Sequence, residues 1–541
     1  MKARQQGSPR RLTSECHAVA AATGAHEAPS APAPAIAHDD RRRPHPLPDP
    51  IRPYEELDGA EGRAVFFRPQ RYTAVDLQPL RAEVEIGVHG VKHACTLRDV
   101  SQSGVALEVS PGVVLAEETR LELSLRFGEH EAYRGEGRVG SIRSQGRATV
   151  VGVSFHDFLL DVDELLELRN MRRWGRLAPS FRLEARPWAL QGSERYKSLV
   201  ADLRLFYEDA RGQLDALERS LPWHVLHGPD NPARRALVEQ LRTEFVADAV
   251  RLTEEVDAAV REVPDGFGNG VAKEWSRRHV HDFIMLSPCC LRALRKPFGY
   301  PGDYGVMDFI YERNFEGATL FARTVQLGFA HVRSSLGVRG RKDLVKQEIR
   351  SLLEQRAGSG RPVRVLSIAA GPAQELAELL SELPEVPAPL EVVLFEQDKN
   401  ALAHASRRLG TLVQPQLSGR VRLRFLHDSI KRLLRDPALF AEVGKFDLVY
   451  SCGLYDYLQD RTAVGLTRHL MAAVGPQGRL LVANMVDNAS RWLLDFHLDW
   501  PLVYRTREQL LEIARRAAPD QRARVVEETS GINPFFEILR D

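Results

Sequence analysis

The chain has 541 residues, 43% of them hydrophobic and 27% charged, so it is long enough to build about two to four domains with buried cores. Its 74 basic and 73 acidic residues leave a formal net charge of +1, which excludes a general attraction to nucleic acid or to anionic membranes. No run of eighteen apolar residues occurs, so the sequence predicts no membrane-spanning helix.

The first segment, residues 1–58, is rich in Ala, Pro, Arg and His and has no apolar core of the kind that signal peptides carry. We expect a disordered tail. The five cysteines are an odd number without zinc-type spacing, and adjacent Cys289 and Cys290 do not readily form a bridge. Reduced thiols and a cytoplasmic location are therefore predicted.

Residues 59–160 contain short runs in which apolar and polar residues alternate, with turns between them. This pattern predicts a small antiparallel β-barrel. Within it, the segment from Asp99 to Gly104 reads DVSQSG, and 151–155 reads VGVSF. Both segments resemble PilZ domains, and the resemblance implies binding of the second messenger cyclic di-GMP.

Dinucleotide-binding PilZ domains carry two arginines before the first strand, because guanidinium groups clamp phosphates and guanine edges. Aligning Arg71 with the second arginine leaves Phe67 at the first, and Arg68 is one residue out of register. The resemblance implies these cyclic di-GMP contacts: Arg68, Arg71, Asp99, Ser101 and Gly104. The alternative is a barrel that has lost its ligand and serves only as a docking surface.

Residues 161–356 are rich in helical patterns, with apolar residues at helical spacing and charged opposite faces. His279 and His281 are two residues apart and face away from each other on a helix, so no metal site is predicted. The segment GYPGDY, 299–304, reads as a tight turn with Pro-Gly at its centre. It is either a plain connection between helices or a lid over a site in the next domain.

Residues 357–541 open with an apolar strand, a turn of small residues from Ala369 to Ala373, a helix, and a second strand that ends at Glu396. Such a turn lets backbone approach a ligand, and the acid is placed to accept hydrogen bonds from a ribose diol. Three more apolar strands follow, one of them leading into Asp428, which can accept a bond from an adenine amine. Strands that alternate with helices predict a doubly wound parallel sheet.

This arrangement resembles the class I S-adenosylmethionine-dependent methyltransferases. Their first turn reads acid-x-Gly-x-Gly-x-Gly, which here aligns Ser367 with the acid and Ala369, Gly371 and Ala373 with the glycines. An alanine where positive φ is needed costs roughly 1 kcal/mol. The resemblance implies these residues around S-adenosylmethionine: Ser367, Ala369, Gly371, Glu396, Gln397, Asp428, Ser429 and Ser451.

Two further segments, Lys296 to Phe315 and YSCGLYDYL at the exit of the fourth strand, resemble proteins that make 3-hydroxypalmitic acid methyl ester. The resemblance covers about residues 190 to 541 and implies carboxyl O-methylation of a hydroxy fatty acid. Candidate residues for the acceptor pocket are Tyr300, Asp303, Tyr304, Tyr455 and Asp456. Asp456 is either a general base or the cap of the helix that begins near Gln459.

The sequence therefore predicts a multi-domain chain with an N-terminal PilZ-like β-barrel, a helical middle region and a C-terminal α/β doubly wound, Rossmann-like domain. The main hypothesis is a methyltransferase that a cyclic di-GMP-responsive barrel regulates. A second hypothesis is a non-catalytic cyclic di-GMP effector that uses a degenerate methyltransferase fold to bind a protein partner. A third is an active enzyme with a silent barrel. The identity of the acceptor, the direction of regulation and the oligomeric state do not follow from the sequence.

Overall fold

The computed structural model describes residues 54–56, 71–88, 90–110, 113, 115–145, 148–177, 193–413, 417, 419–436 and 438–541. Most of the predicted disordered tail lies outside these residues. Glu55 and Glu56, at its end, form strand β1 (Glu55–Glu56), which pairs with the parallel strand β11 (Val421–His427). An ion pair of 2.8 Å between Glu55 and Arg424 holds the short strand at this sheet edge.

The N-terminal barrel closes within the described residues through six antiparallel strands, because β5 pairs with both β8 and β4. A short additional strand, β2, lies beside β4. The strands are β2 (Tyr72–Thr73), β3 (Ala82–Val88), β4 (Val91–Ser101), β5 (Gly104–Val109), β6 (Arg120–Phe127), β7 (His130–Gln145) and β8 (Ala148–Phe155).

Alternation of side chains fills the barrel. In β6, residues Leu121, Leu123, Leu125 and Phe127 are all buried, while the residues between them point outward. The barrel that the sequence predicts is confirmed. Helix α1 (Val162–Leu177) follows it.

The middle region is helical, as predicted, and five of its described helices are capped by a side-chain acceptor such as Asn231, Asn269 or Thr319. Its core joins aromatic residues of several helices, including Tyr207, Phe245 and Phe321. The elements are α2 (Glu194–Ser220), α3 (Trp223–His227), α4 (Pro232–Leu241), η3 (Arg242–Val246), α5 (Ala247–Arg261), η4 (Gly266–Gly268), α6 (Gly270–Ile284), α7 (Pro288–Arg295), α8 (Tyr304–Tyr311), α9 (Leu320–Phe329) and α10 (Arg333–Gln355).

The C-terminal domain is built on a sheet with the order β1-β11-β10-β9-β12-β13-β15-β14 among the described residues. Apart from those already given, its strands are β9 (Val363–Ile368), β10 (Leu390–Glu396), β12 (Phe446–Ser451), β13 (Val474–Ala483), β14 (Arg522–Val526) and β15 (Phe535–Leu539). Its remaining helical elements are α11 (Gln374–Glu382), α12 (Lys399–Val413), α13 (Ile430–Arg435), η5 (Tyr455–Tyr457), α14 (Asp460–Ala473), η6 (Leu493–His497) and α15 (Arg507–Ala517).

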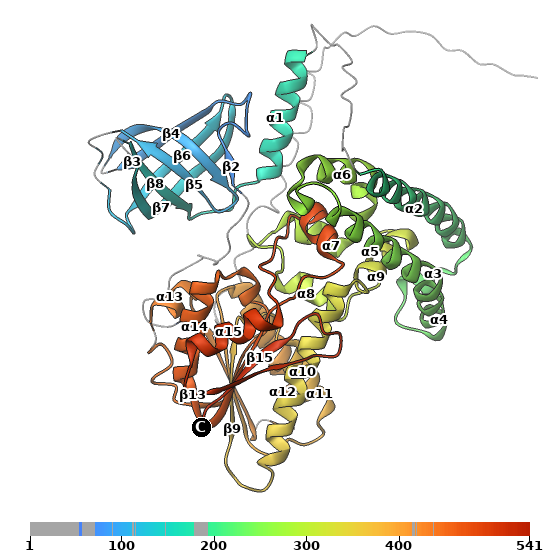
Figure 1. The fold of residues 1–541 in the computed structure, drawn as a ribbon, viewed down its shortest axis with the longest axis vertical. Coiled ribbons are helices and arrows are strands. Elements are labelled where there is room, and N and C mark those ends of the chain that lie inside the picture. Colours follow the sequence, from blue (N-terminus) through green and yellow to red (C-terminus); the bar gives the residue numbers. More distant parts are fainter. Residues whose placement is uncertain are drawn as a thin grey trace, which may run out of the picture. The chain divides into compact units, whose positions relative to one another are not determined.

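Helices cover both faces of this sheet. One core contains residues of α10, α11 and α12, and the other contains residues of α13, α14 and α15. Figure 1 shows these two sets of helices on opposite sides of the sheet. The doubly wound prediction is confirmed, with one difference: β15 runs antiparallel to both β13 and β14, so the sheet is mixed. The order of β9 to β12 reverses at β9, and ligands of such sheets bind at this point, outside the carboxyl ends of the strands.

Candidate functional site

A cleft opens where β9, β10 and β12 end. It encloses about 1280 Å³ of empty space, counting its open mouth. The turn after β9 contributes to its wall, and so do helix α10 and the segment Tyr300 to Tyr304. The cleft therefore lies at the sheet position that the sequence predicts for a nucleoside, and the helical region encloses it.

The turn after β9 keeps a left-handed backbone at all three positions that align with glycines. The φ angles are 54° at Ala369, 55° at Gly371 and 51° at Ala373. An L-residue pays about 1–2 kcal/mol to adopt this conformation. The shape of the glycine turn is thus retained although two of its glycines are alanines.

We expect Ala369→Gly to raise the thermal midpoint of this domain by about 1–3 °C. Relief of the left-handed strain, about 1–2 kcal/mol, exceeds the entropy of about 0.4–1 kcal/mol that glycine adds to the unfolded chain. Ala370 is a matched control because its φ is not positive. Ala370→Gly should lower the midpoint, and equal shifts for both variants would contradict strain at Ala369. Differential scanning fluorimetry measures both.

Glu396 ends β10 and is 5% exposed. One carboxylate oxygen accepts the N–H of Gly371 at 2.9 Å, and the other accepts the N–H groups of Gln397 at 2.8 Å and Asp398 at 3.0 Å. Burial raises the pKa of Glu396 to about 7, although these bonds oppose the rise. The acid therefore faces the cleft with three of its roughly four acceptor positions in use.

Ser367, Ala369, Gly371, Glu396 and Gln397 all border the cleft. The other three predicted cofactor residues do not. Asp428 accepts the N–H of Ser429 at 2.6 Å and pairs with Arg432 at 2.8 Å, and Ser429 caps α13. Ser451 is buried at the end of β12.

Two aromatic residues at the start of α8 border the cleft: Tyr300 in the preceding segment and Tyr304, the first residue of the helix. The Tyr300 hydroxyl donates to Asp398 at 2.9 Å, which ties this segment to the end of β10. Asp303 is fully buried, caps α8 and pairs with Arg292 at 2.7 Å, so it faces protein rather than the cleft. Its role is to fix the start of the helix that carries Tyr304.

Asp456 borders the cleft, and Tyr455 does not. The Tyr455 side chain is fully buried and its hydroxyl bonds Thr467 at 2.9 Å. Asp456 accepts the N–H of Met485 at 2.7 Å, whereas α14 begins at Asp460 with Gln459 at its N-cap. The interpretation of Asp456 as the cap of that helix is wrong, since its carboxylate is committed elsewhere.

Sequence reasoning missed Arg341, on α10. Its side chain is 7% exposed and borders the cleft, its Nη1 lies 3.7 Å from Asp456, and its Nε has no hydrogen-bond partner among the described residues. A signal was present: Arg341 occupies a helical stripe with the buried apolar residues Val338 and Val345. A charge in such a stripe must find a partner, in the protein or in a ligand.

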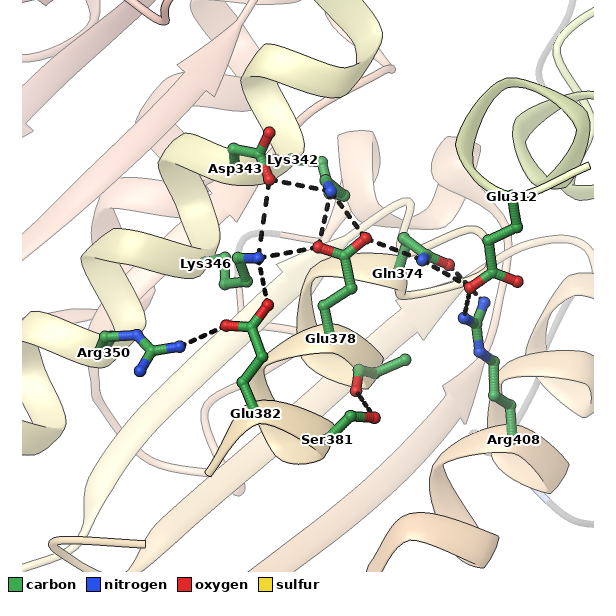
Figure 2. A network of polar contacts seen from close by, with 11 residues as sticks. Glu312, Lys342, Asp343, Lys346, Arg350, Gln374, Glu378, Ser381, Glu382 and Arg408 are labelled. Atoms are coloured by element: carbon green, nitrogen blue, oxygen red, sulfur yellow. Dashed lines mark hydrogen bonds and ion pairs between the residues drawn. The ribbon is translucent and has the colours of Figure 1, made fainter. Parts of the chain in front are cut away.

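An ion-pair network fixes the helix that carries Arg341 (Figure 2). On α10, Lys342 and Lys346 pair with Glu378 of α11 at 2.7 and 2.9 Å, and Lys346 also pairs with Glu382 at 2.7 Å. Networks of this kind hold geometry better than single surface pairs do. The position of the guanidinium over the cleft is therefore set by α11, the helix that follows the β9 turn.

In the barrel, Arg71 pairs with Asp99 at 2.8 Å, so two of the predicted dinucleotide residues meet. Ser101 donates to the carbonyl of Gly104 at 3.1 Å. A Cβ at Gly104 would lie 2.4 Å from the Val153 carbonyl oxygen, so only glycine fits there. Arg68 lies outside the described residues.

In the described part of the chain, no group of three or more His, Cys, Asp or Glu side chains is placed to hold a metal ion. His279 bonds the Trp275 carbonyl and His281 contacts His497. None of the helices there is both long and apolar enough to cross a bilayer.

Two family models match the chain. Residues 66–169 match the family described as "PilZ domain", and residues 298–484 match the family described as "Putative methyltransferase". No curated protein sequence matches.

Among solved structures, a "possible exported protein" from Bordetella parapertussis is 19% identical over 58% of this chain and 99% of its own, with a TM-score of 0.37. Magnesium protoporphyrin IX methyltransferase from Synechocystis PCC 6803, with bound SAH, is 12% identical over 43% and 92%, with a TM-score of 0.30. The S-adenosylmethionine-dependent methyltransferase SibL is 18% identical over 66% and 99%, with a TM-score of 0.32. Scores this low carry no argument about function. The described residues therefore form a closed six-stranded barrel in the segment that matches the PilZ family model, a helical region, and a C-terminal α/β domain that shares the match to the putative methyltransferase family model with the end of the helical region.

Proposed function

We propose that this protein is an S-adenosylmethionine-dependent methyltransferase that methylates the carboxylate of a hydroxy fatty acid, and that its PilZ domain regulates it by binding cyclic di-GMP. We also propose that it acts in the cytoplasm. The observation that carries the proposal is a cleft bordered by two charged groups. One is the carboxylate of Glu396, which can accept hydrogen bonds from a ribose, and the other is the buried guanidinium of Arg341.

The residues at the end of β9 and β10 fit the cofactor. A Cβ built on Gly371 meets no atom within 4 Å, so the turn leaves room for a ligand against its backbone. Glu396 offers its remaining acceptor position to one ribose hydroxyl. If both hydroxyls bind, the second one replaces the hydrogen bond from the N–H of Gly371. Ser367, Ala369 and Gln397 also border this side of the cleft. Asp428, Ser429 and Ser451 lie after neighbouring strands or at their ends and do not border it. When bound, the cofactor supplies an electrophilic methyl group.

Arg341 fits the acceptor. A guanidinium with an unused Nε donor binds a carboxylate through charge-assisted hydrogen bonds. A carboxylate of ordinary pKa near ~4.3 is ionised at pH 7 and needs no general base. The protein therefore has to orient it and exclude water. Asp456 holds the guanidinium from the other side, at 3.7 Å.

The other candidate residues take supporting roles in this proposal. Tyr300 and Tyr304 border the acceptor and act as a lid, and Asp303 positions the helix of Tyr304. Tyr455 precedes Asp456 in η5, is fully buried and anchors this turn through its bond to Thr467. Burial raises the pKa of Asp456, and the nearby Arg341 opposes the rise. Its bond to Met485 makes it a positioning residue rather than a free base.

Calorimetric titration with S-adenosylmethionine, followed by assay of methyl transfer to 3-hydroxy fatty acids by mass spectrometry, tests the proposal. Binding with ester formation supports it. Binding with methyl transfer only to other acceptors would support methyltransferase activity and exclude a fatty-acid carboxylate as the methyl acceptor. Cyclic di-GMP binding without any affinity for S-adenosylmethionine would instead support the non-catalytic effector.

The PilZ proposal gives a separate prediction. Arg71→Ala should weaken cyclic di-GMP binding about tenfold or more, because a charge-assisted bond contributes about 1.5–3 kcal/mol. Arg98 is a matched control, since it is also a half-exposed barrel arginine with an acidic partner, Glu108 at 2.7 Å. Arg98→Ala should bind as wild type does in the same titration. If the wild-type chain binds no dinucleotide, the barrel is a docking surface.

A further inference from the structure

A second cavity adjoins the cleft inside the helical region. It contains about 410 Å³ of empty space, counting any opening. Phe329, at the end of α9, borders both spaces. On η6, Leu493 borders the second cavity and its neighbour Leu494 borders the cleft. The two spaces are therefore separated by the thickness of single side chains.

The wall of the second cavity is mainly apolar. It includes Phe245, Val250, Ile284, Val325 and Leu493, and the polar side chains at its border are Tyr207, Thr253, Cys290 and Trp492. The hydroxyl of Thr253 is committed to the carbonyl of Ala249 at 2.7 Å. A polar ligand would lose most of its bonds to water here, so the surface suits a hydrocarbon group better than a polar one.

Two irregular helical turns lie at the wall of this cavity. Both π-helical segments of the described residues border it: η3 through Phe245 and η6 through Leu493. A π-helical turn carries an extra residue, and such turns are frequent at functional sites. Two of them around one apolar cavity indicate a binding space rather than a packing defect.

We propose that this second cavity binds the distal part of an elongated aliphatic acceptor whose carboxylate lies at Arg341, and that Phe329 and the cavity wall determine which chain lengths are accepted. The inference rests on the proposed function, because it needs an acceptor with its head group in the cleft. It adds a second subsite and the residues that set specificity. The cleft holds the reacting end, and the helical region selects the tail.

Gly328 offers a way to fill this cavity. It lies in the regular helix α9, and a Cβ there would be 3.9 Å from Phe245, which is ordinary contact. The side chain of Gly328→Leu then occupies the cavity. Gly212 is the matched control: it is an exposed helical glycine on α2 with no atom near its Cβ.

Calorimetry with 3-hydroxy acids of eight to sixteen carbons, on protein saturated with S-adenosylhomocysteine, tests the proposal. In the wild type, each methylene that enters the cavity should tighten binding about fourfold. Gly328→Leu should weaken binding of the sixteen-carbon acid at least tenfold and leave the eight-carbon acid and S-adenosylhomocysteine unchanged. Gly212→Leu should match the wild type throughout.

Equal binding of the long acid by Gly328→Leu and wild type would overturn the inference and leave the proposed function standing. Failure of every acid to bind wild type that does bind S-adenosylhomocysteine would remove both the acceptor class and the subsite. If Gly328→Leu does not fold, the deciding experiment is photo-crosslinking of the wild-type protein with a sixteen-carbon acid that carries a terminal diazirine. Labelling of peptides that contain Phe245 or Ile284 supports the subsite, and labelling confined to cleft residues overturns it.

Discussion

Replacing Arg341 by lysine should lower kcat/KM for a carboxylate acceptor about 10- to 100-fold, mainly through KM, while the affinity for S-adenosylmethionine stays at its wild-type value. Lysine keeps the charge next to Asp456 but loses the planar fork that binds a carboxylate through two N–H groups. Charge-assisted hydrogen bonds contribute about 1.5–3 kcal/mol, which gives this range. Steady-state kinetics with a 3-hydroxy fatty acid measures the effect.

Arg339 provides the matched control for this substitution. It lies two residues earlier on α10, is partly buried, bonds the Ile310 carbonyl at 3.3 Å and does not border the cleft. Arg339→Lys should leave the acceptor KM unchanged. A loss of cofactor affinity in Arg341→Lys, with an unchanged acceptor KM, would assign the guanidinium to the carboxylate of S-adenosylmethionine.

The affinity for S-adenosylmethionine should rise about tenfold between pH 6 and pH 8. A ribose hydroxyl donates best to an ionised carboxylate, and the pKa of Glu396 is about 7, so ionisation of this group limits binding at the lower pH. The sign is opposite for the ligand-free fold. There the raised pKa stabilises the folded state below about pH 4.5, and this contribution is lost as the pH rises through 7.

Glu396→Gln isolates this effect. The glutamine side chain cannot ionise, so the tenfold dependence of S-adenosylmethionine affinity on pH should disappear. Any pH dependence that remains belongs to other groups or to the ligand. Its affinity at pH 8 should be lower by about 1–3 kcal/mol, because the amide presents an N–H group to backbone donors or to the ribose. A pH dependence in the variant equal to that of wild type would show that Glu396 is not the ribose acceptor. Calorimetry at both pH values, with circular dichroism to check folding, is sufficient.

Local patterns predicted those parts of the fold in which a residue's neighbours in sequence decide its environment. Alternation in β6 identified the barrel, and the apolar run into Glu396 identified the second strand of the sheet. The mixed edge of the sheet was missed, since the direction of β15 depends on its hairpin with β14 and not on its own composition.

The site was predictable on the strand side and less so on the helical side. Glu396 and the β9 turn follow directly from strand ends, whereas Arg341 and Asp398 act through partners about 115 and 98 residues away in the chain. Such distant pairs leave little trace in a single sequence. The second cavity is harder still, because it is bounded by side chains of many helices and no one of them has an unusual composition.

The alanines of the β9 turn bear on how a ligand is received. A glycine turn samples many backbone conformations before binding, and each must be given up when a ligand orders the turn. A Cβ at Ala369 and Ala373 leaves fewer conformations than glycine has, and folding holds both residues in the left-handed one against its strain. The conformational entropy of the turn is therefore lost during folding rather than at the moment of association, and a ligand that fits the turn binds with a smaller entropic penalty.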